Sequence, residues 1–349
     1  MFAEVPLPDK INGKVAMMIK GLTAGAGGLE TFNARADIQK GRVILKALAT
    51  PLDNINALVD ITEAKVGVPD ITLNIGRGTV KANAGLDDYL SRPRYRASMD
   101  MQGLDIAELV DQKDFPVKVE GKIFGALQVQ GEGFDPAVMA NALTGNGNME
   151  IKEGKLTDIN ILKLVLDKIT IVPNFRQRVE ENLPERFKDK LKQKDTILTQ
   201  AKLAILIGQG KAAINPLNVE ADGFLFEGTG EAGFDLRYNF DGTFMIPQDL
   251  SLSMANIVPE LEYLYDGQGQ IIFPLKVSGQ GADIRFMPDM EYIITNAVKN
   301  KGRQELQKVL DKVFGKESET PPAATPAPPQ REKDPTQILI EGVLDSIFK

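Results

Sequence analysis

The side chains available for chemistry are carboxylates, hydroxyls, phenols and lysines, because the 349-residue chain contains no His, no Cys and no Trp. These absences exclude a zinc thiolate site, a Cys nucleophile and a Ser-His-Asp triad. Two adjacent acidic pairs, Asp87-Asp88 and Glu180-Glu181, have the residue type of a general acid and base. Neighbouring carboxylates on a solvated surface are far commoner, so we predict that the chain is not an enzyme and needs no cofactor or metal.

Glycines at 228, 230 and 233 match the G-x-G-x-x-G spacing of a dinucleotide-binding loop. That loop requires a helix directly after it. Residues Ala232–Phe240 instead alternate apolar and polar side chains, which predicts one continuous β-strand. We therefore predict that the glycines mark a turn or bulge between two strands and that no nucleotide binds there.

The charge balance also restricts the partners. With 41 basic and 48 acidic residues the net charge is −7, which opposes the capture of a polyanion, so no nucleic-acid partner is predicted. No apolar run approaches the ~18 residues that a membrane-spanning helix needs. The first residues lack the basic and then apolar segments of a signal peptide.

The elements that must position any site are β-strands. Apolar residues recur at every second position, with polar residues between them, as expected for antiparallel strands that are solvated on one face. Such runs include Val15-Met17-Ile19, Ile71-Leu73-Ile75, Tyr95-Ala97-Met99-Met101, Leu203-Ile205-Ile207 and Leu250-Leu252-Met254. The strands are too many and too evenly spaced for an α/β fold.

Helical spacing interrupts this alternation in two places. We predict helical insertions near 158–194, with a break at Pro184, and near 288–314. Residues 317–333 are rich in Pro and predict an extended linker. Residues 334–349 predict an amphipathic C-terminal helix. Residues 1–316 are predicted to form one domain.

An apolar strand that contains Pro274-Leu275-Lys276-Val277-Ser278-Gly279, a second short strand and then Pro288-Asp289 form a distinctive pattern. This pattern resembles the C-terminal region of the AsmA-like family of bacterial envelope proteins. The resemblance spans about residues 1–316 and is specific over 115–165 and 195–300. It implies a periplasmic protein that is anchored to the inner membrane through an N-terminal segment absent from this chain.

The predicted fold class is mainly β: a long, twisted antiparallel sheet that is curled into an open half-pipe, with a few amphipathic helices. The apolar face of such a groove would bind acyl chains, since each buried CH2 contributes about 0.8 kcal/mol. The predicted lining residues are Leu127, Val129, Phe234, Leu236, Tyr238, Phe240, Phe273, Leu275 and Val277. A sandwich or closed barrel has the same periodicity, in which case these residues form an ordinary core.

The resemblance implies a lipid-binding and lipid-transfer protein that carries phospholipid or another acylated lipid and supports outer-membrane biogenesis. An alternative is a structural or assembly factor that pairs with envelope membrane proteins through exposed sheet edges. A glycan-cleaving enzyme with two carboxylates is a third class, and it would need acidic residues gathered in a cleft.

Overall fold

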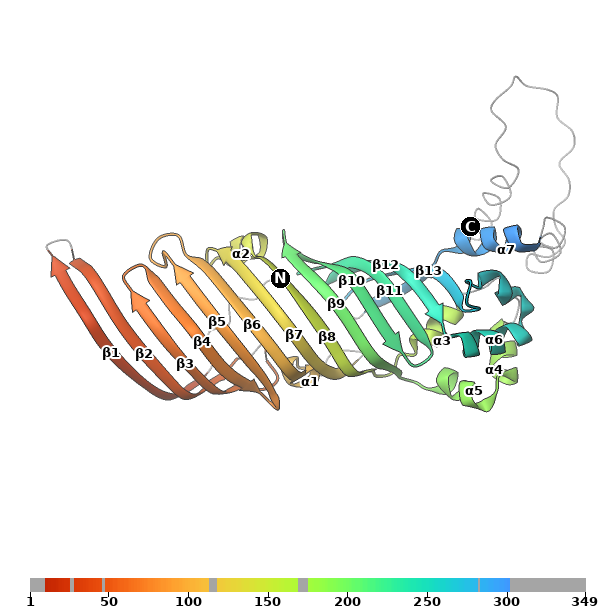
Figure 1. Ribbon diagram of the computed structural model, residues 1–349, viewed down its shortest axis with the longest axis horizontal. Helices are drawn as coiled ribbons and strands as arrows, with labels where there is room; N and C mark the ends of the chain where they lie inside the picture. The colour runs from red at the N-terminus through yellow and green to blue at the C-terminus, as the bar shows by residue number, and fades with distance from the viewer. Residues whose placement is uncertain are drawn as a thin grey trace, which may run out of the picture. The chain divides into compact units, whose positions relative to one another are not determined.

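A computed structural model describes residues 10–25, 28–45, 48–112, 118–168, 175–281 and 283–301 (Figure 1). The predicted linker over 317–333 and the predicted helix over 334–349 lie outside these residues. The sequence predicts one domain up to residue 316, whereas the chain divides into two compact units. The sheet unit contains Met1–Ile161, Gln193–Gly242 and Val277–Arg285, and the second unit contains Leu162–Lys192, Thr243–Lys276 and Phe286–Lys349.

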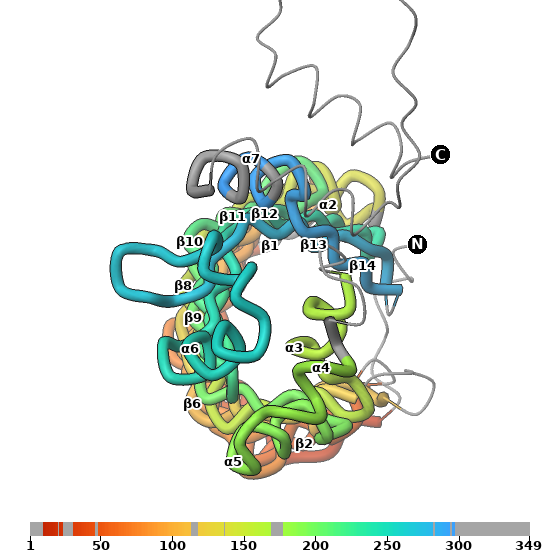
Figure 2. The backbone as a smooth tube through the Cα atoms, turned by 90° about the vertical axis from the view of Figure 1, so that its right-hand side faces the viewer, coloured from red at the N-terminus to blue at the C-terminus, as the bar shows by residue number. Residues whose placement is uncertain are grey.

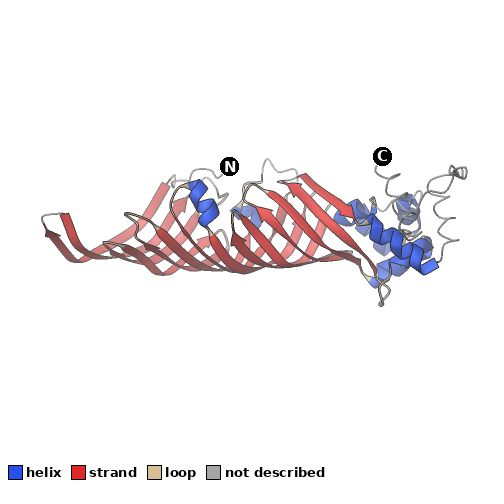
Figure 3. Cartoon of the chain, turned by 90° about the horizontal axis from the view of Figure 1, so that it is seen from above, coloured by secondary structure: helices blue, strands red, loops and turns tan. Residues whose placement is uncertain are grey.

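The described strands form one 14-stranded sheet in which every strand neighbours the strands before and after it in sequence (Figure 3). The described pairs from β1 to β11 are all antiparallel. Strands β1 and β14 are the two edges, so the sheet is open, as predicted. The strands are β1 (Lys10–Gly25), β2 (Gly28–Ile44), β3 (Leu52–Thr62), β4 (Lys65–Ile75), β5 (Gly78–Asp87), β6 (Arg94–Asp105), β7 (Val119–Glu132), β8 (Thr144–Leu156), β9 (Thr196–Gly208), β10 (Lys211–Ala221), β11 (Phe224–Gly233), β12 (Arg237–Ile246), β13 (Ile271–Gln280) and β14 (Asp283–Pro288).

Viewed end-on, the strands of the sheet unit follow a curve and not a plane (Figure 2). Two short helices connect strands within this unit. Helix α1 (Ile106–Leu109) follows β6, and Asp105 caps it by accepting a hydrogen bond from the Ala107 N–H at 3.0 Å. Helix α2 (Pro136–Ala142) follows β7 and has Pro at its first turn and the Asp135 carboxylate as its cap. These caps fix where each helix begins.

The strand predicted over Ala232–Phe240 is wrong. Strand β11 ends at Gly233, residues 234–236 form a turn, and β12 begins at Arg237. Alternation cannot reveal this reversal because the apolar residues keep the same parity on both sides of the turn. The local signal is Asp235, whose carboxylate accepts a hydrogen bond from the Arg237 N–H at 3.1 Å, as turn-forming aspartates do.

The glycines of the G-x-G-x-x-G pattern lie inside β11, so their prediction as a turn between strands is also wrong. The turn begins only after Gly233. The prediction that no helix follows the glycines is confirmed, since β12 comes next.

The second unit contains most of the helices. The helices predicted near 158–194 are α3 (Ile161–Leu166), α4 (Phe175–Asn182) and α5 (Glu185–Lys192), and the break at Pro184 is confirmed. Helix α7 (Met290–Lys301) lies within the range predicted for the later helical segment. A 3-10 helix, η1 (Pro259–Leu264), follows α6 (Gln248–Ile257).

Helix α6 replaces the strand predicted at Leu250-Leu252-Met254. Leu250, Met254 and Val258 are buried at intervals of four, whereas Leu252 is exposed, so the true period is helical. The buried Ser251 hydroxyl donates to the Ile246 carbonyl at 2.8 Å and accepts from the Ile271 N–H at 2.9 Å. Its hydrogen bonds connect α6 to β12 and β13 in the core of this unit.

A carboxylate links the ends of the segment that leaves the sheet after β8. Asp195 accepts a hydrogen bond from the Asp158 N–H at 2.9 Å and pairs with Lys155 Nζ at 3.5 Å. The hydrogen bond from Asp158 and then the charge of Lys155 lower the pKa of Asp195. Because the pKa of Asp195 is lower in the folded protein than the unfolded value of about 3.9, its charged carboxylate stabilises the fold at any pH above that value. This stabilisation is lost as the pH falls through the pKa of the folded state.

We therefore expect Asp195→Ala to lower the melting temperature at pH 7, and the difference from the wild type to shrink between pH 5 and pH 3. Circular dichroism melts over this range measure it. The matched control is Asp70→Ala, because Asp70 is an exposed aspartate within β4. An Asp195→Ala difference that stays constant with pH would show that the carboxylate charge contributes nothing.

Candidate functional site: the apolar face of the sheet

One row of residues crosses the sheet unit from β1 to β11 without a polar side chain. Each member is the register partner of the next, which places one residue of the row on each strand. The row is Val15, Ile38, Ala57, Ile71, Ala82, Met99, Leu127, Gly147, Ile205, Ile214 and Gly230. With strands about 4.8 Å apart, the row is about 48 Å long.

A second row lies two residues along each strand from β5 to β11, and three residues along β4, where a register shift between Val68 and Ile71 adds one residue. Its members are Val68, Ala84, Ala97, Val129, Gly145, Ile207, Ala212 and Ala232. Because side chains alternate between the faces of a sheet, both rows lie on the same face. We call this surface the apolar face.

Part of the apolar face is enclosed. Ile75, Val80, Met101 and Leu104 are buried together, and Leu109 of α1 packs against them. Elsewhere on the face, the side chains along β6, β7 and β9 are half-buried. Half-buried apolar side chains still expose hydrocarbon to water, so a further apolar surface that covers them is stabilised by burial.

Glycines keep this face shallow in two places. A Cβ atom at Gly147 would lie 3.0 Å from Leu127 Cδ1, and one at Gly230 would overlap the Phe240 ring. The large side chains therefore lie across the glycines of the neighbouring strand, as aromatic residues often do over sheet glycines. Neither glycine has space for a side chain of its own.

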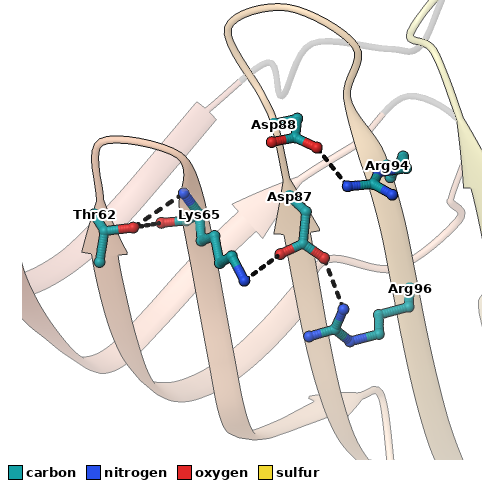
Figure 4. Close-up of polar contacts among 6 residues, drawn as sticks. All are labelled: Thr62, Lys65, Asp87, Asp88, Arg94 and Arg96. Atoms are coloured by element: carbon teal, nitrogen blue, oxygen red, sulfur yellow. Dashed lines mark hydrogen bonds and ion pairs between the residues drawn. The ribbon is translucent and has the colours of Figure 1, made fainter.

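The opposite face carries ion pairs. Asp87 pairs with Arg96 at 2.8 Å and with Lys65 at 3.7 Å, and Asp88 pairs with Arg94 at 2.5 Å (Figure 4). The acidic pair considered for acid and base chemistry is thus held by three cations on an exposed surface. Such pairs contribute little to stability, about 0–1 kcal/mol each.

The second acidic pair is placed similarly. Glu180 lies 3.9 Å from Lys163, and Glu181 accepts a hydrogen bond from Gln177 at 2.9 Å, one turn earlier in α4. Within the described ranges, no three residues of the His, Cys, Asp and Glu types gather as a metal site would require. The helices that the structure describes include none long and apolar enough to cross a membrane.

Five of the predicted lining residues lie half-buried in strands of the sheet unit. Leu127 and Val129 occupy the two rows on β7 and alternate with exposed Gln128 and Gln130. The other three are Tyr238 and Phe240 on β12 and Val277 on β13. The rings of Tyr238 and Phe240 are 6.3 Å apart. Burial and the nearby charge of Asp283 raise the pKa of the Tyr238 phenol.

The other four lie elsewhere. Phe234 and Leu236 belong to the turn between β11 and β12, where Leu236 has a φ of 67° and is exposed. Phe273 and Leu275 are buried in the second unit, where the Phe273 ring stacks on Phe244 at 5.4 Å. Phe234 and Leu236 thus lie in a turn and not in a strand, and Phe273 and Leu275 are closed off from solvent, which corrects their expected setting in an open groove. Lipid binding by these residues stays a prediction.

Sequence reasoning omitted most of the two rows from the predicted site. Met99, Ile205 and Ile207 show the same alternation as the chosen residues, so the signal was present. Alternation assigns a residue to a face but not to a place across the sheet. Only the pairing register shows that these residues align with Leu127 and Val129.

Comparison with protein families identifies a family for this chain. The model of the AsmA family matches residues 35–217, slightly more than half of the chain. The matched segment includes most of β2 and all of β3 to β9, and thus the greater part of both apolar rows. It ends before the Pro274–Gly279 stretch. No curated protein and no solved structure matches the chain.

Proposed function

Because this chain belongs to the AsmA family, we propose that it binds the acyl chains of a lipid on its apolar face and works in lipid transport or assembly of the bacterial envelope. The finer form of the proposal is transfer of phospholipid or another acylated lipid through the periplasm, in support of outer-membrane biogenesis. The proposal assigns the chain no catalytic step and no cofactor.

The observation that carries the proposal is the unbroken apolar row from Val15 to Gly230. Each CH2 group that covers this face contributes about 0.8 kcal/mol, while a headgroup remains in water at the open side of the sheet. One leaflet of a bilayer has a hydrocarbon depth of about 15 Å, half of the ~30 Å core. The row of about 48 Å is roughly three times as long, so it offers several successive positions to one acyl chain.

An apolar chain that moves along such a row meets no polar group that it must desolvate. The positions are therefore close in free energy, which favours sliding over tight binding at one place. A pocket for one ligand would instead have a few fixed polar groups that set its orientation. This difference favours transfer along the sheet over a receptor for one molecule.

The direct test is the lipid content of the purified protein. We expect organic extracts of protein purified without detergent to contain phospholipid or another acylated lipid by mass spectrometry. We also expect the lipid-stripped protein to take up a fluorescent phospholipid from vesicles. Protein that carries no lipid and takes up none would refute the proposed function.

The sheet edge favours a second candidate function, that of an assembly factor. Strand β1 is an edge of 16 residues, and its apolar side chains are exposed. A long apolar edge is a template for a strand from another protein. This candidate predicts lipid-free protein, so the extraction experiment separates it from lipid binding.

A further inference from the structure

The hairpin turns after β5, β7, β9 and β11 lie along one rim of the sheet unit. In a sheet of consecutive antiparallel strands, every turn that follows an odd-numbered strand falls on the same side. These turns lie along the upper edge of the sheet in Figure 1, with α2 among them. We call this edge the first rim, and the edge that carries α1 the second rim.

Large apolar side chains project from the turns of the first rim. Leu90 is 81% exposed, Leu236 65%, Phe134 54% and Val138 48%. They belong to the turns between β5 and β6, β11 and β12, and β7 and β8. On the second rim of this unit, the large apolar residues of comparable exposure in the described segments are Ile11 at 66%, at the start of the edge strand β1, Val110 at 43% and Ile197 at 42%. Over β5 to β12, the two rims therefore differ.

The basic side chains near these turns form ion pairs with carboxylates. Arg92 pairs with Glu132 at 2.7 Å, and Arg237 pairs with Asp235 at 2.5 Å. Lys211 pairs with Glu231 at 2.6 Å in the same way. Attraction between this rim and a charged surface is accordingly weak.

The spacing of these turns along the first rim indicates what kind of partner covers their apolar side chains. Adjacent turns on the rim are about 10 Å apart and the outermost two about 29 Å, at about 4.8 Å per strand. Single apolar side chains at that spacing, with ion pairs nearby, do not form the continuous apolar core of a stable protein interface, which buries about 800 Å2 per partner in total. The headgroup region of a bilayer needs no such core, because apolar side chains enter it one by one to about 5–10 Å.

We propose that the first rim rests on a lipid bilayer, with Leu90, Phe134 and Leu236 inserted among the headgroups. The interaction is hydrophobic, so it does not depend on anionic lipid. This inference goes beyond the proposed function, since a rim on a membrane does not require lipid on the apolar face.

The chain has no Trp, so a single introduced Trp reports on one position. We expect Leu90→Trp, Phe134→Trp and Leu236→Trp each to show a blue-shifted emission on phosphatidylcholine vesicles and quenching by brominated phosphatidylcholine. Val110→Trp on the second rim is the control and should show neither effect. Equal quenching at Val110 would refute the orientation.

A triple variant, Leu90→Glu, Phe134→Glu and Leu236→Glu, should reduce co-sedimentation with phosphatidylcholine vesicles by at least about tenfold. It should melt like the wild type, because all three side chains are exposed. Its co-extracted lipid should be unchanged, which separates this proposal from lipid binding on the sheet. Wild-type protein that ignores phosphatidylcholine vesicles, or that binds only after phosphatidylglycerol is added, would overturn the proposal. Vesicle binding by the triple variant at the wild-type level would overturn it too.

Discussion

Leu127→Asp is expected to remove bound lipid from the protein. Leu127 is half-buried on β7 at the middle of the apolar row, between Met99 on β6 and Gly147 on β8. An acyl chain that covers this position would bury an unpaired carboxylate, at a cost of about 2 kcal/mol or more. This corresponds to roughly thirtyfold weaker binding. Mass spectrometry of extracts and uptake of fluorescent phospholipid measure the loss.

The matched control is Leu206→Asp. Leu206 is the same residue type on β9, but its parity places it on the opposite face and it is 64% exposed. An aspartate there stays in water, so lipid content should remain that of the wild type. Both variants must retain the wild-type circular dichroism spectrum. Equal lipid loss in the two variants would show that the apolar face is not where lipid binds.

Leu250→Ala is expected to destabilise the second unit by about 2–5 kcal/mol. Leu250 is 2% exposed on α6, beside the buried Ser251 that connects this helix to β12 and β13. Truncation of its side chain leaves a cavity in a core that includes the stacked pair Phe244 and Phe273. Urea denaturation followed by circular dichroism measures the free energy of unfolding.

Leu252→Ala on the same helix is the control, because Leu252 is exposed. It should change the free energy of unfolding by less than about 0.5 kcal/mol. The pair of variants also tests the period of this segment, since a strand with alternating burial would make Leu250 and Leu252 equally sensitive. Equal losses would contradict the helix.

The sequence predicts the class of fold well because a one-sided sheet and an amphipathic helix have different periods. Alternation at Tyr95–Met101 and at Leu203–Ile207 correctly identifies β6 and β9, and Pro184 correctly separates α4 from α5. The errors arise where two periods overlap. Leu250, Leu252 and Met254 fit a period of two, although the burial of Leu250, Met254 and Val258 follows the helical period.

The candidate site was less predictable than the fold. The apolar residues of the site can be recognised in the sequence, but their alignment into a row across the sheet depends on the register between strands. β-Bulges shift this register in several strand pairs, for example between Met101 and Leu104 on β6. The turn at 234–236 moves Leu236 away from the face on which its parity placed it. A closed core around Phe273 depends on contacts between distant segments, which periodicity does not report.

The neighbour-to-neighbour order of the strands has a consequence for how this sheet forms and how its size changes in evolution. Most strand pairs close a short loop, the exceptions being the helical connections between β8 and β9 and between β12 and β13. The entropy cost of most steps is therefore small, and folding can start at any short hairpin and spread to the next. Stability is then close to a sum of hairpins and of the contacts between adjacent ones, as in repeat proteins. Insertion or loss of one hairpin, such as β3 and β4, changes the length of the sheet by about 10 Å and leaves the path of the other strands unchanged.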